Sequence, residues 1–549
     1  MKKLFILSLL FSSVHCVKSQ TIDEAKTHFY YERYASAADV LRSVIAKGDP
    51  SPDAYYWLGE IFLKKGRLDS ARKALMDGAG YVMSKGYSKK DAPLVYIGWS
   101  HFLLDSGNTN ARADMESVLE ETRYKNPEAL LAAARANIEG KNGDVAWAIE
   151  LLEKAIKRDR KNPEIYTVLG DAYSKQLDGG NAIKNYDEAL EVNASFAEAM
   201  YRKGKIYKSQ NNPAIYMDRF NKAYAIDSTY PPLLYELYSF YYFRDVVKAK
   251  KYLDKFISNS DPSPEQAYMK TDLMYVSKKY EGAIDGAKSI ITAEADKAQP
   301  RLYKMIAYSY AALGDSVQAL ESMNRYFDKE DPSEFVAKDF ELKAKLLEKT
   351  SVDKTASIEW YKKALAAQSD INEKLGYMKT LADLQKDLGN RDREAAWRGE
   401  IYKTTSNPSN LVIYKWGLAL YSNQNYTKAD SVFAIYQEKY PEQIYGYLWR
   451  ARCNALIDSS MKLGLAVPHY VKLIEVASKD SVKNKSIIMK AYDYLGGYEA
   501  TITKNFQASL GYFENLLVLD PENSDAQKNT ELLRKWIEQG KGNGVTTNN

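Results

Sequence analysis

The sequence predicts an all-α solenoid, a stack of helix–turn–helix units without one central core. Three observations predict it. The 549 residues exceed the roughly 250 to 300 residues at which single cores stop growing, so the chain must form several domains or a repeat array. A pattern of small and large apolar residues recurs at steps of 34 residues. Prolines stand at or near the boundaries between the copies of that pattern.

The first nineteen residues are expected to be a secretory signal and not part of the fold. Lys2 and Lys3 form a basic end, residues 4–14 form an apolar run, and Val17 and Ser19 supply a small-residue exit before the mature chain. An apolar run of this length is too short to span a bilayer, which takes about 20 residues. We therefore expect an exported chain, in the periplasm or associated with the outer membrane.

Charge and cysteine content exclude several functional classes. Without residues 1–19 the chain has 74 basic and 72 acidic residues, so bulk charge does not favour nucleic-acid binding. Cys453 is then the only thiol, which excludes an internal disulfide and a cysteine-ligated zinc site. Cys16 lies at the end of the signal, where a bacterial lipoprotein carries its lipid. The residues before it resemble a lipobox only poorly, so lipidation stays an open alternative.

The repeat is clearest in one stretch whose apolar and small residues define the positions of a unit. Positions 4, 7, 8, 11, 20, 24 and 27 are Tyr166, Leu169, Gly170, Tyr173, Ala182, Tyr186 and Ala189. A step of 34 residues leads forward to Met200 and back to Ala132 at position 4. Positions 4 to 11 share one stripe of a first helix, and positions 20 to 27 share one stripe of a second. Small residues at 8 and 20 let the two backbones approach, and the large residue at 24 fills the space beside them.

The same frame organises the rest of the chain. It reappears from Tyr55, from Tyr303 and from Ile413 at position 4. Asp or Asn precedes proline at several boundaries: Asn162-Pro163, Asp261-Pro262, Asp331-Pro332 and Asp520-Pro521. Proline is tolerated in the first turn of a helix, and Asn or Asp caps a helix N-terminus. We expect each pair to end one helix and to start the next.

These residues resemble tetratricopeptide repeat (TPR) units, which are 34-residue helix–turn–helix repeats. The resemblance implies a right-handed superhelix of about 13 to 14 units between Ile22 and Asp525. The expected organisation is a signal peptide (1–19), an N-terminal array (20–332), degenerate units (333–408), a C-terminal array (409–525), a capping helix (526–540) and a disordered tail (541–549). The degenerate units are a candidate bend, and a single continuous solenoid is the alternative.

The resemblance also implies a binding surface, because positions 5, 9 and 12 of TPR units line an inner groove. The residues predicted for this groove are Tyr201, Lys205, Lys208, Tyr235, Tyr242, Lys304, Tyr308, Tyr414 and Tyr421. Tyrosine and lysine suit a peptide or a partner helix. The implied function is a non-enzymatic envelope scaffold that holds a protein or peptide, in envelope assembly or secretion. The alternative is a glycan or small-ligand module that uses Tyr201, Tyr235 and Tyr242.

The sequence predicts no catalytic site, cofactor or metal. It lacks a phosphate-binding glycine loop, a zinc-protease helix and a nucleophile elbow. His28 and His101 both fall at position 11, where other units place tyrosine, so packing is their expected role. Cys453 is expected to be a small buried residue. An enzymatic alternative requires His469, Cys453 and a carboxylate in one pocket.

Overall fold

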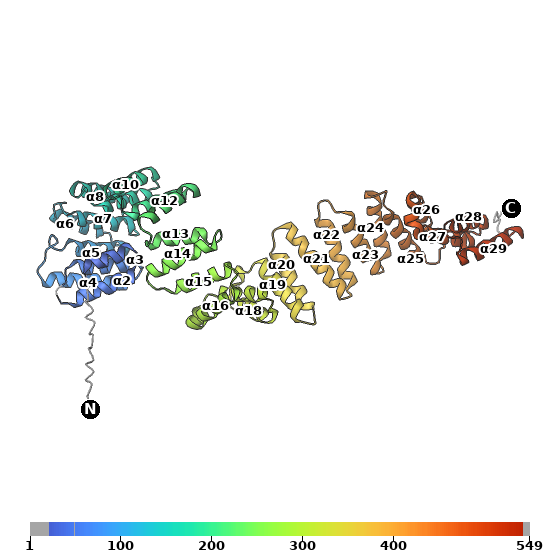
Figure 1. Cartoon of the computed structure of the whole chain (residues 1–549), viewed down its shortest axis with the longest axis horizontal. Helices are drawn as coiled ribbons and strands as arrows, with labels where there is room; N and C mark the ends of the chain where they lie inside the picture. Colours follow the sequence, from blue (N-terminus) through green and yellow to red (C-terminus); the bar gives the residue numbers. More distant parts are fainter. Residues whose placement is uncertain (1–20, 49, 542–549) are drawn as a thin grey trace, which may run out of the picture. The chain divides into compact units, whose positions relative to one another are not determined.

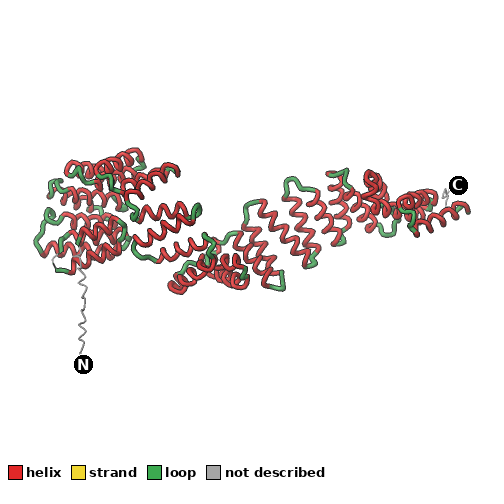
Figure 2. The backbone as a smooth tube through the Cα atoms, viewed as in Figure 1, coloured by secondary structure: helices red, strands yellow, loops and turns green. Residues whose placement is uncertain are grey.

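The computed structural model describes residues 21–48 and 50–541. Over these residues every regular element is a helix, as the sequence predicts (Figure 2). The predicted signal peptide, with Cys16, and the predicted tail from residue 542 lie outside the described residues. The chain divides into two compact units, one that ends at Ala298 and one that begins at Gln299. They are the N-terminal unit and the C-terminal unit below.

The N-terminal unit contains sixteen of the α-helices in the described part of the chain (Figure 1). They are α1 (Ile22–Tyr30), α2 (Tyr34–Ala46), α3 (Asp53–Lys64), α4 (Leu68–Ser84), α5 (Pro93–Asp105), α6 (Ala111–Glu121), α7 (Pro127–Glu139), α8 (Val145–Arg158), α9 (Pro163–Lys175), α10 (Gly179–Val192), α11 (Ala197–Ser209), α12 (Pro213–Ile226), α13 (Pro231–Tyr241), α14 (Val246–Asn259), α15 (Pro264–Val276) and α16 (Tyr280–Glu294). A short 3₁₀ helix, η1 (Ala295–Lys297), follows them.

The C-terminal unit contains the remaining helices of the described residues. They are α17 (Arg301–Leu313), α18 (Ser316–Lys329), η2 (Pro332–Glu334), α19 (Ala337–Thr350), α20 (Thr355–Ala367), α21 (Ile371–Asp387), α22 (Arg391–Thr404), α23 (Asn410–Ser422), α24 (Tyr426–Lys439), α25 (Ile444–Ile457), α26 (Val467–Ala477), η3 (Ser478–Asp480), α27 (Ser481–Tyr498), η4 (Glu499–Thr503), α28 (Phe506–Leu519) and α29 (Ser524–Glu538). The element η4 is one turn of π-helix.

The helices pack in consecutive pairs, from α1 with α2 to α27 with α28, and α29 packs on α28. This arrangement confirms the all-α solenoid. The segment 333–408, where the repeat pattern is weakest, still forms the pairs α19–α20 and α21–α22. The two compact units divide earlier, between Ala298 and Gln299, and not in that segment. Within the described residues, no helix combines the length and apolar character that crossing a bilayer requires.

The small and large positions of the repeat meet as predicted. A Cβ atom placed on Gly204 of α11 would come within 2.6 Å of the Phe220 ring on α12, and the same distance separates such an atom on Gly417 from the ring of Phe433. These pairs occupy positions 8 and 24 of their units. Phe220 and Phe433 are fully buried, so the missing side chain at position 8 makes room for the ring at position 24.

The Asn-Pro boundary behaves as predicted, but at Asp520-Pro521 and at Asp261-Pro262 the next helix begins only at Ser524 and at Pro264. Asn162 caps α9, since its Oδ1 accepts a hydrogen bond from the backbone N–H of Glu164 at 3.0 Å and Pro163 is the first helical residue. The prediction that Asp261 helps to start the next helix is wrong. Helix α15 begins at Pro264, and the carboxylate of Asp261 instead bonds the start of α2.

Candidate functional site

The N-terminal unit closes on itself, because the segment that joins its first two helices contacts residues near the end of the unit, between 196 and 261. Tyr31 Oη donates a hydrogen bond to Asp227 Oδ2 at 2.9 Å, and Arg33 Nε donates to the carbonyl of Asn259 at 2.5 Å. The ring of Tyr30 packs 5.3 Å from that of Tyr230. These contacts, between residues 30–36 and residues 196–261, are the seam. They convert an open solenoid turn into a closed one.

Asp261 caps α2 across this seam. Its carboxylate accepts hydrogen bonds from the backbone N–H groups of Ala35 at 2.7 Å and Ser36 at 3.3 Å, and from Ser36 Oγ at 2.6 Å. The local residue at the cap position, Arg33, provides no side-chain cap. A carboxylate at this position satisfies unpaired N–H groups and complements the positive end of the helix dipole. The N-terminus of α2 is thus completed by a residue more than 200 positions away in sequence.

A cleft of about 910 Å³ runs along the seam. We call it the seam cleft; its walls come from the loop after α1, from α2 and from α3 on one side, and from α11, α13, the end of α14 and the start of α15 on the other. Among its lining residues are Tyr31, Glu32, Tyr34, Arg42, Phe62, Arg67, Tyr201, Lys205, Pro231, Tyr235, Glu236, Phe256, Asp261, Pro262 and Gln266. The cleft combines aromatic rings and prolines with a few polar groups, the composition of peptide-binding surfaces.

Three of the predicted groove residues, Tyr201, Lys205 and Tyr235, line the seam cleft together. Tyr235 is the most available of them, at 49% exposed. Tyr201 is 9% exposed, and its ring stacks on Phe220. Lys205 Nζ lies 2.7 Å from Glu236 Oε1, so its charge is already paired. Only Tyr235 therefore presents a wide contact surface to a ligand.

The other predicted groove residues of this unit have mainly internal contacts. Lys208 forms a second ion pair with Glu236, whose pKa is lowered because the two lysines outweigh the effect of burial. Tyr242 lies at the end of α13, with its ring edge on Tyr238 at 5.6 Å and on Phe243 at 4.6 Å. Positions 9 and 12 of α11 thus join it to α13, the first helix of the next unit.

The predicted groove residues of the C-terminal unit make similar contacts within that unit. Lys304 Nζ lies 2.7 Å from Asp339 Oδ2, and Tyr308 Oη donates to Asp339 Oδ1 at 3.0 Å. Tyr414 and Tyr421 both pack on Trp449, at ring-centroid distances of 6.4 and 4.9 Å. These side chains do not join the three in the seam cleft in any one described cleft. That they contact a partner stays a prediction.

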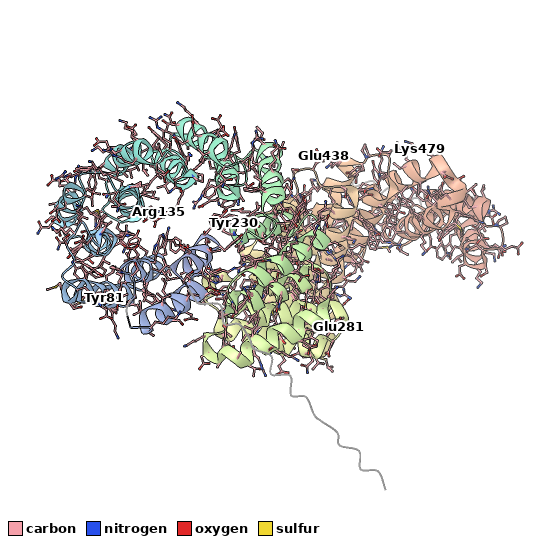
Figure 3. All side chains as sticks on the ribbon, turned by 60° about the vertical axis from the view of Figure 1, so that its left-hand side comes forward. Tyr81, Arg135, Tyr230, Glu281, Glu438 and Lys479 are labelled. Atoms are coloured by element: carbon pink, nitrogen blue, oxygen red, sulfur yellow. The ribbon has the colours of Figure 1, made fainter. Side chains whose placement is uncertain are left out.

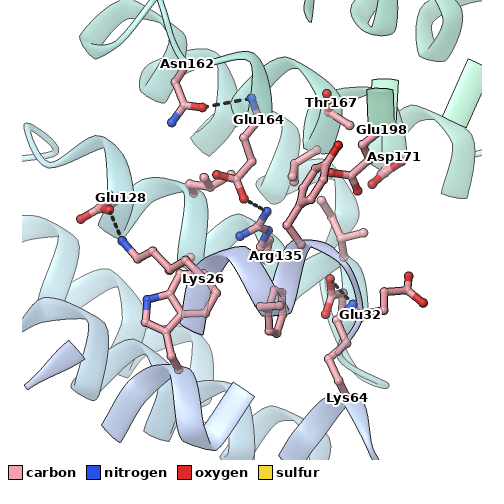
Figure 4. A pocket seen from close by; sticks show the side chains of 18 of the residues that line it. Lys26, Glu32, Lys64, Glu128, Arg135, Asn162, Glu164, Thr167, Asp171 and Glu198 are labelled. Atoms are coloured by element: carbon pink, nitrogen blue, oxygen red, sulfur yellow. Dashed lines mark hydrogen bonds and ion pairs between the residues drawn. The ribbon is translucent and has the colours of Figure 1, made fainter. Parts of the chain in front are cut away.

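A second cavity, of about 250 Å³, lies inside the closed turn. We call it the inner cavity, and Figure 4 shows its charged side chains. In Figure 3 Arg135 and Tyr230 lie on the inner side of the helices. First helices supply most of its lining: Lys26, Phe29, Tyr30, Tyr56, Trp57, Lys64, Glu128, Arg135, Glu139, Glu164, Asp171, Glu198 and Arg202, with Tyr230 from the seam. Glu32 and Tyr34 line both cavities.

Ion pairs connect different repeats of the N-terminal unit around the inner cavity. Lys64 Nζ lies 2.7 Å from Glu139 Oε1, and Arg135 pairs with Glu164 of the next unit. Burial raises the pKa of Glu139, but Lys64 and Arg135 outweigh it and leave that pKa below its ordinary value. The pKa of Glu198 is instead raised, by burial first and by Asp171 next, although Arg202 acts in the opposite direction.

Sequence reasoning missed the inner cavity. Glu164 and Glu198 stand one period of 34 residues apart at position 2, and Arg135 interrupts a run of alanines. Charged residues at these positions, on the apolar side of the first helices, were the sequence feature that could have indicated the cavity. The closure that brings them together depends on the pitch of the stack, which no local pattern encodes.

The three histidines and the thiol of Cys453 do not form one common site among the described residues. His101 is buried at position 11, with Nδ1 3.0 Å from Glu60 Oε2. Nδ1 of His28 is buried without a hydrogen-bond partner. Cys453 is fully buried, as expected, and burial followed by Asp430 raises the pKa of its thiol to about 12. His469 is also close enough to Asp430 and Arg450 for their charges to act on it, yet no hydrogen bond among the described residues joins it to Cys453.

Comparisons with known proteins match these repeats. Profiles described as tetratricopeptide repeat match residues 22–79, in α1 to α4, and residues 411–442, in α23 and α24. Each compact unit therefore contains one matched segment.

Solved structures similar to the chain include the C-terminal part of a TPR repeat-containing protein from Cytophaga hutchinsonii, at 29% identity over 48% of this chain and 98% of that one, with a TM-score of 0.32. A tetratricopeptide repeat protein from Parabacteroides merdae matches at 16% identity over 52% of this chain and 96% of its own, with a TM-score of 0.21. The human IFIT1 dimer, solved with m7Gppp-AAAA, matches at 15% identity over 76% of this chain and 99% of its own, with a TM-score of 0.32.

Proposed function

This chain is a tetratricopeptide repeat protein, and we propose that it is a non-enzymatic scaffold of the cell envelope that binds a partner protein or peptide through the seam cleft. The TPR fold is a protein-interaction scaffold, because stacked repeats present an extended concave surface. The identity of the partner does not follow from the fold.

The observation that carries this proposal is the convergence of Tyr201, Lys205 and Tyr235 in one cleft of about 910 Å³. The cleft has the size of known ligand sites. Tyr235 offers a half-exposed aromatic ring, and aromatic side chains dominate the binding energy of interfaces. Pro231, Phe256 and Pro262 add rigid apolar surface on the same side. Such a surface suits an extended segment of a partner.

Two sequence features support the cellular part of the proposal. Residues 1–19 have the basic, apolar and small-residue regions of a secretory signal, which supports export to the periplasm or the outer membrane. The nearly balanced charge of the mature chain does not favour a nucleic-acid partner. A role in envelope assembly or secretion is part of the same proposal, and lipidation at Cys16 is a variant of it.

The non-enzymatic part rests on the chemistry of the candidate groups. A thiol whose pKa is about 12 carries very little thiolate at neutral pH, and Cys453 is fully buried. The nearby carboxylate of Asp430 is already held by Arg450 Nε at 2.9 Å and by Asn454 Nδ2 at 2.8 Å. The thiol is therefore a poor nucleophile, and the neighbouring carboxylate is already bonded to other side chains.

No specific contact favours the glycan alternative. A saccharide stacks on a free aromatic face, whereas Tyr201 has one face against Phe220 and meets Tyr230 edge-on at 5.5 Å. Tyr235 is the one ring of that predicted set in the seam cleft with half of its surface exposed.

Affinity capture from the envelope extract of the source cell tests the proposal. We expect Tyr235→Ala to reduce recovery of the captured partner about tenfold or more, the effect of removing a central aromatic residue from an interface. Tyr87→Ala is the matched control, because Tyr87 is 39% exposed and lies outside both cavities. Equal recovery of the partner by the wild-type chain and the Tyr235→Ala chain would contradict binding in the seam cleft.

A further inference from the structure

The inner cavity contains more negative than positive charge. Six carboxylates and four cations line it, which leaves a formal excess of two negative charges. All four cations have carboxylate partners: Lys26 with Glu128, Lys64 with Glu139, Arg135 with Glu164, and Arg202 with Glu198. Glu32 has no ion pair among the described residues. Any further group that enters the cavity therefore meets uncompensated carboxylate charge.

One of the two excess charges lies beside Arg202. This guanidinium serves two carboxylates, Glu198 at 3.0 Å and Asp171 at 3.8 Å. The longer distance, measured from Nε, is beyond a hydrogen bond, and Nε has no hydrogen-bond partner among the described residues. One cation between two carboxylates leaves one negative charge uncompensated. Burial is the main cause of the raised pKa of Glu198, and Asp171 and Glu164 add to it, against the effect of Arg202.

The rest of the wall suits a cation as well. Tyr30, Tyr34, Tyr56, Trp57 and Tyr230 line the same cavity. Aromatic faces attract ammonium and guanidinium groups, and more strongly where water is excluded. The cavity already contains one such contact, because Lys26 Nζ lies 5.5 Å from the centre of the Trp57 ring. Carboxylates beside aromatic faces form a site for a positively charged group.

The size and position of the cavity limit what it can hold. A volume of about 250 Å³ is below that of most drug-sized ligand sites, so it fits one side chain or one small molecule and not a folded partner. Glu32 and Tyr34 belong to the walls of both the inner cavity and the seam cleft. A residue of a peptide in the seam cleft, or a free small cation, would pass these two side chains.

We propose that the inner cavity binds one cationic group, a guanidinium or an ammonium, between the Glu198–Asp171 carboxylates and the aromatic wall. The two sources of this chemistry are a basic side chain of a bound peptide and a free small cation. The site is separate from Tyr235, so it can be occupied whether or not the seam cleft binds a partner.

Isothermal titration calorimetry of the mature chain tests the proposal with N-acetyl-arginine amide as the probe and N-acetyl-citrulline amide as its neutral isostere. We expect the affinity for the citrulline compound to be lower by a factor of about ten or more, because this compound lacks the positive charge that the carboxylates bind. Equal affinities, or no heat from the arginine compound, would overturn the proposal. This comparison uses the wild-type protein, so it does not depend on the folding of a variant.

Variants locate the site. The double variant Glu198→Gln and Asp171→Asn keeps the size of both side chains and the acceptor that Tyr186 Oη uses at 2.8 Å. We expect it to bind the arginine compound about tenfold more weakly. Glu191→Gln is the matched control, since Glu191 is exposed on the outer helix α10. An unchanged affinity in a double variant with wild-type circular dichroism would overturn the assignment to the inner cavity.

A third arm separates the two sources. The pentapeptide acetyl-Gly-Gly-Arg-Gly-Gly-amide is compared with butylguanidinium in the wild-type chain and in Tyr235→Ala. Tighter binding of the peptide that Tyr235→Ala abolishes supports a basic side chain delivered through the seam cleft. Equal binding of both probes, insensitive to Tyr235→Ala, supports a free small cation. That second result counts against peptide binding in the seam cleft and leaves the cation site intact, so the two proposals fail separately.

Discussion

At the scale of single residues, the N-terminal unit contains buried charged side chains that are paired with side chains of opposite charge. His101 is 3% exposed, and Glu60 at 5% exposed is its partner on the preceding first helix. Burial lowers the pKa of His101, but the carboxylate of Glu60 outweighs it and leaves that pKa above its ordinary value. Glu139 and Asp105 act in the same direction as Glu60.

This pair predicts how stability depends on pH. A histidine whose pKa is higher in the folded state stabilises the fold fully below its unfolded pKa, about 6.5, and the stabilisation is lost as pH rises through the folded pKa. We expect the thermal midpoint of the chain to fall as pH rises from about 6 through that higher value. In His101→Gln this part of the fall should disappear. At pH 6 the free energy of unfolding of this variant should be about 3 kcal/mol lower than that of the wild type, because the buried carboxylate of Glu60 loses its charged partner.

His469→Gln is the control for this prediction. Burial and Arg450 lower the pKa of His469, so any pH dependence that it contributes has the opposite sign: a rise in stability up to its unfolded pKa of about 6.5 and none above it. His469→Gln should therefore leave the fall in stability above about pH 7 unchanged. Identical pH profiles of the wild-type and His101→Gln chains in thermal unfolding would contradict the role assigned to the pair.

Residue roles were only partly predictable. The position of His101 in the repeat predicted packing, and the side chain is indeed buried. Its partner was not predictable, because Glu60 lies 41 residues away in the preceding unit. The lysines at positions 9 and 12, Lys205 and Lys208, bond Glu236, a partner that the pattern did not indicate, and that they also meet a ligand stays a prediction. The repeat pattern predicts which face of a helix a residue occupies. It does not predict which side chain becomes the hydrogen-bond or ion-pair partner of that residue.

At the scale of helices, the best-predicted feature is the small residue at position 8. Gly204→Ala should destabilise the chain by about 1 to 3 kcal/mol, because its Cβ would overlap the buried ring of Phe220. Gly511→Ala in α28 is the matched change, since nothing lies within 4 Å of a Cβ there. That substitution should stabilise by about 0.5 to 1 kcal/mol through helix propensity. Urea unfolding measures both, and the same sign for the two variants would contradict the packing account.

The cap of α2 is the helix feature that sequence reasoning predicted wrongly. An Asp-Pro pair normally caps the helix that follows it, but the chain of Asp261 turns back to the seam before α15 begins. Asp261→Ala should cost about 1 kcal/mol, the usual effect of removing a cap. Amide exchange of residues 34–46 should become faster, since the start of α2 loses its acceptor.

Asp331→Ala is the control for the cap. Its side chain also accepts a local backbone hydrogen bond, from Ser333 at 2.8 Å, but in the C-terminal unit. Hydrogen–deuterium exchange in residues 34–46 should stay at the wild-type rate in that variant. An equally unchanged rate in Asp261→Ala would show that the seam does not depend on the cap.

At the scale of the whole chain, periodicity predicted the solenoid, and long-range closure decided the site. Helix pairs follow the 34-residue frame because each pair buries its own small and large stripe against the next. The seam joins residues about 200 positions apart, through Tyr31, Arg33 and Asp261. Small rotations between successive units add up to that closure, so neither cavity could be located from the repeat alone.

The most direct test of the proposed scaffold is photo-cross-linking from position 235 in the living source cell. A photoreactive phenylalanine analogue that replaces Tyr235 places the reactive group in the seam cleft, and the same analogue at Met83, 77% exposed on α4, places it outside both cavities. The account predicts a discrete cross-linked partner from position 235 and none from position 83. The same products from both positions, or none from position 235, would contradict partner binding in the seam cleft.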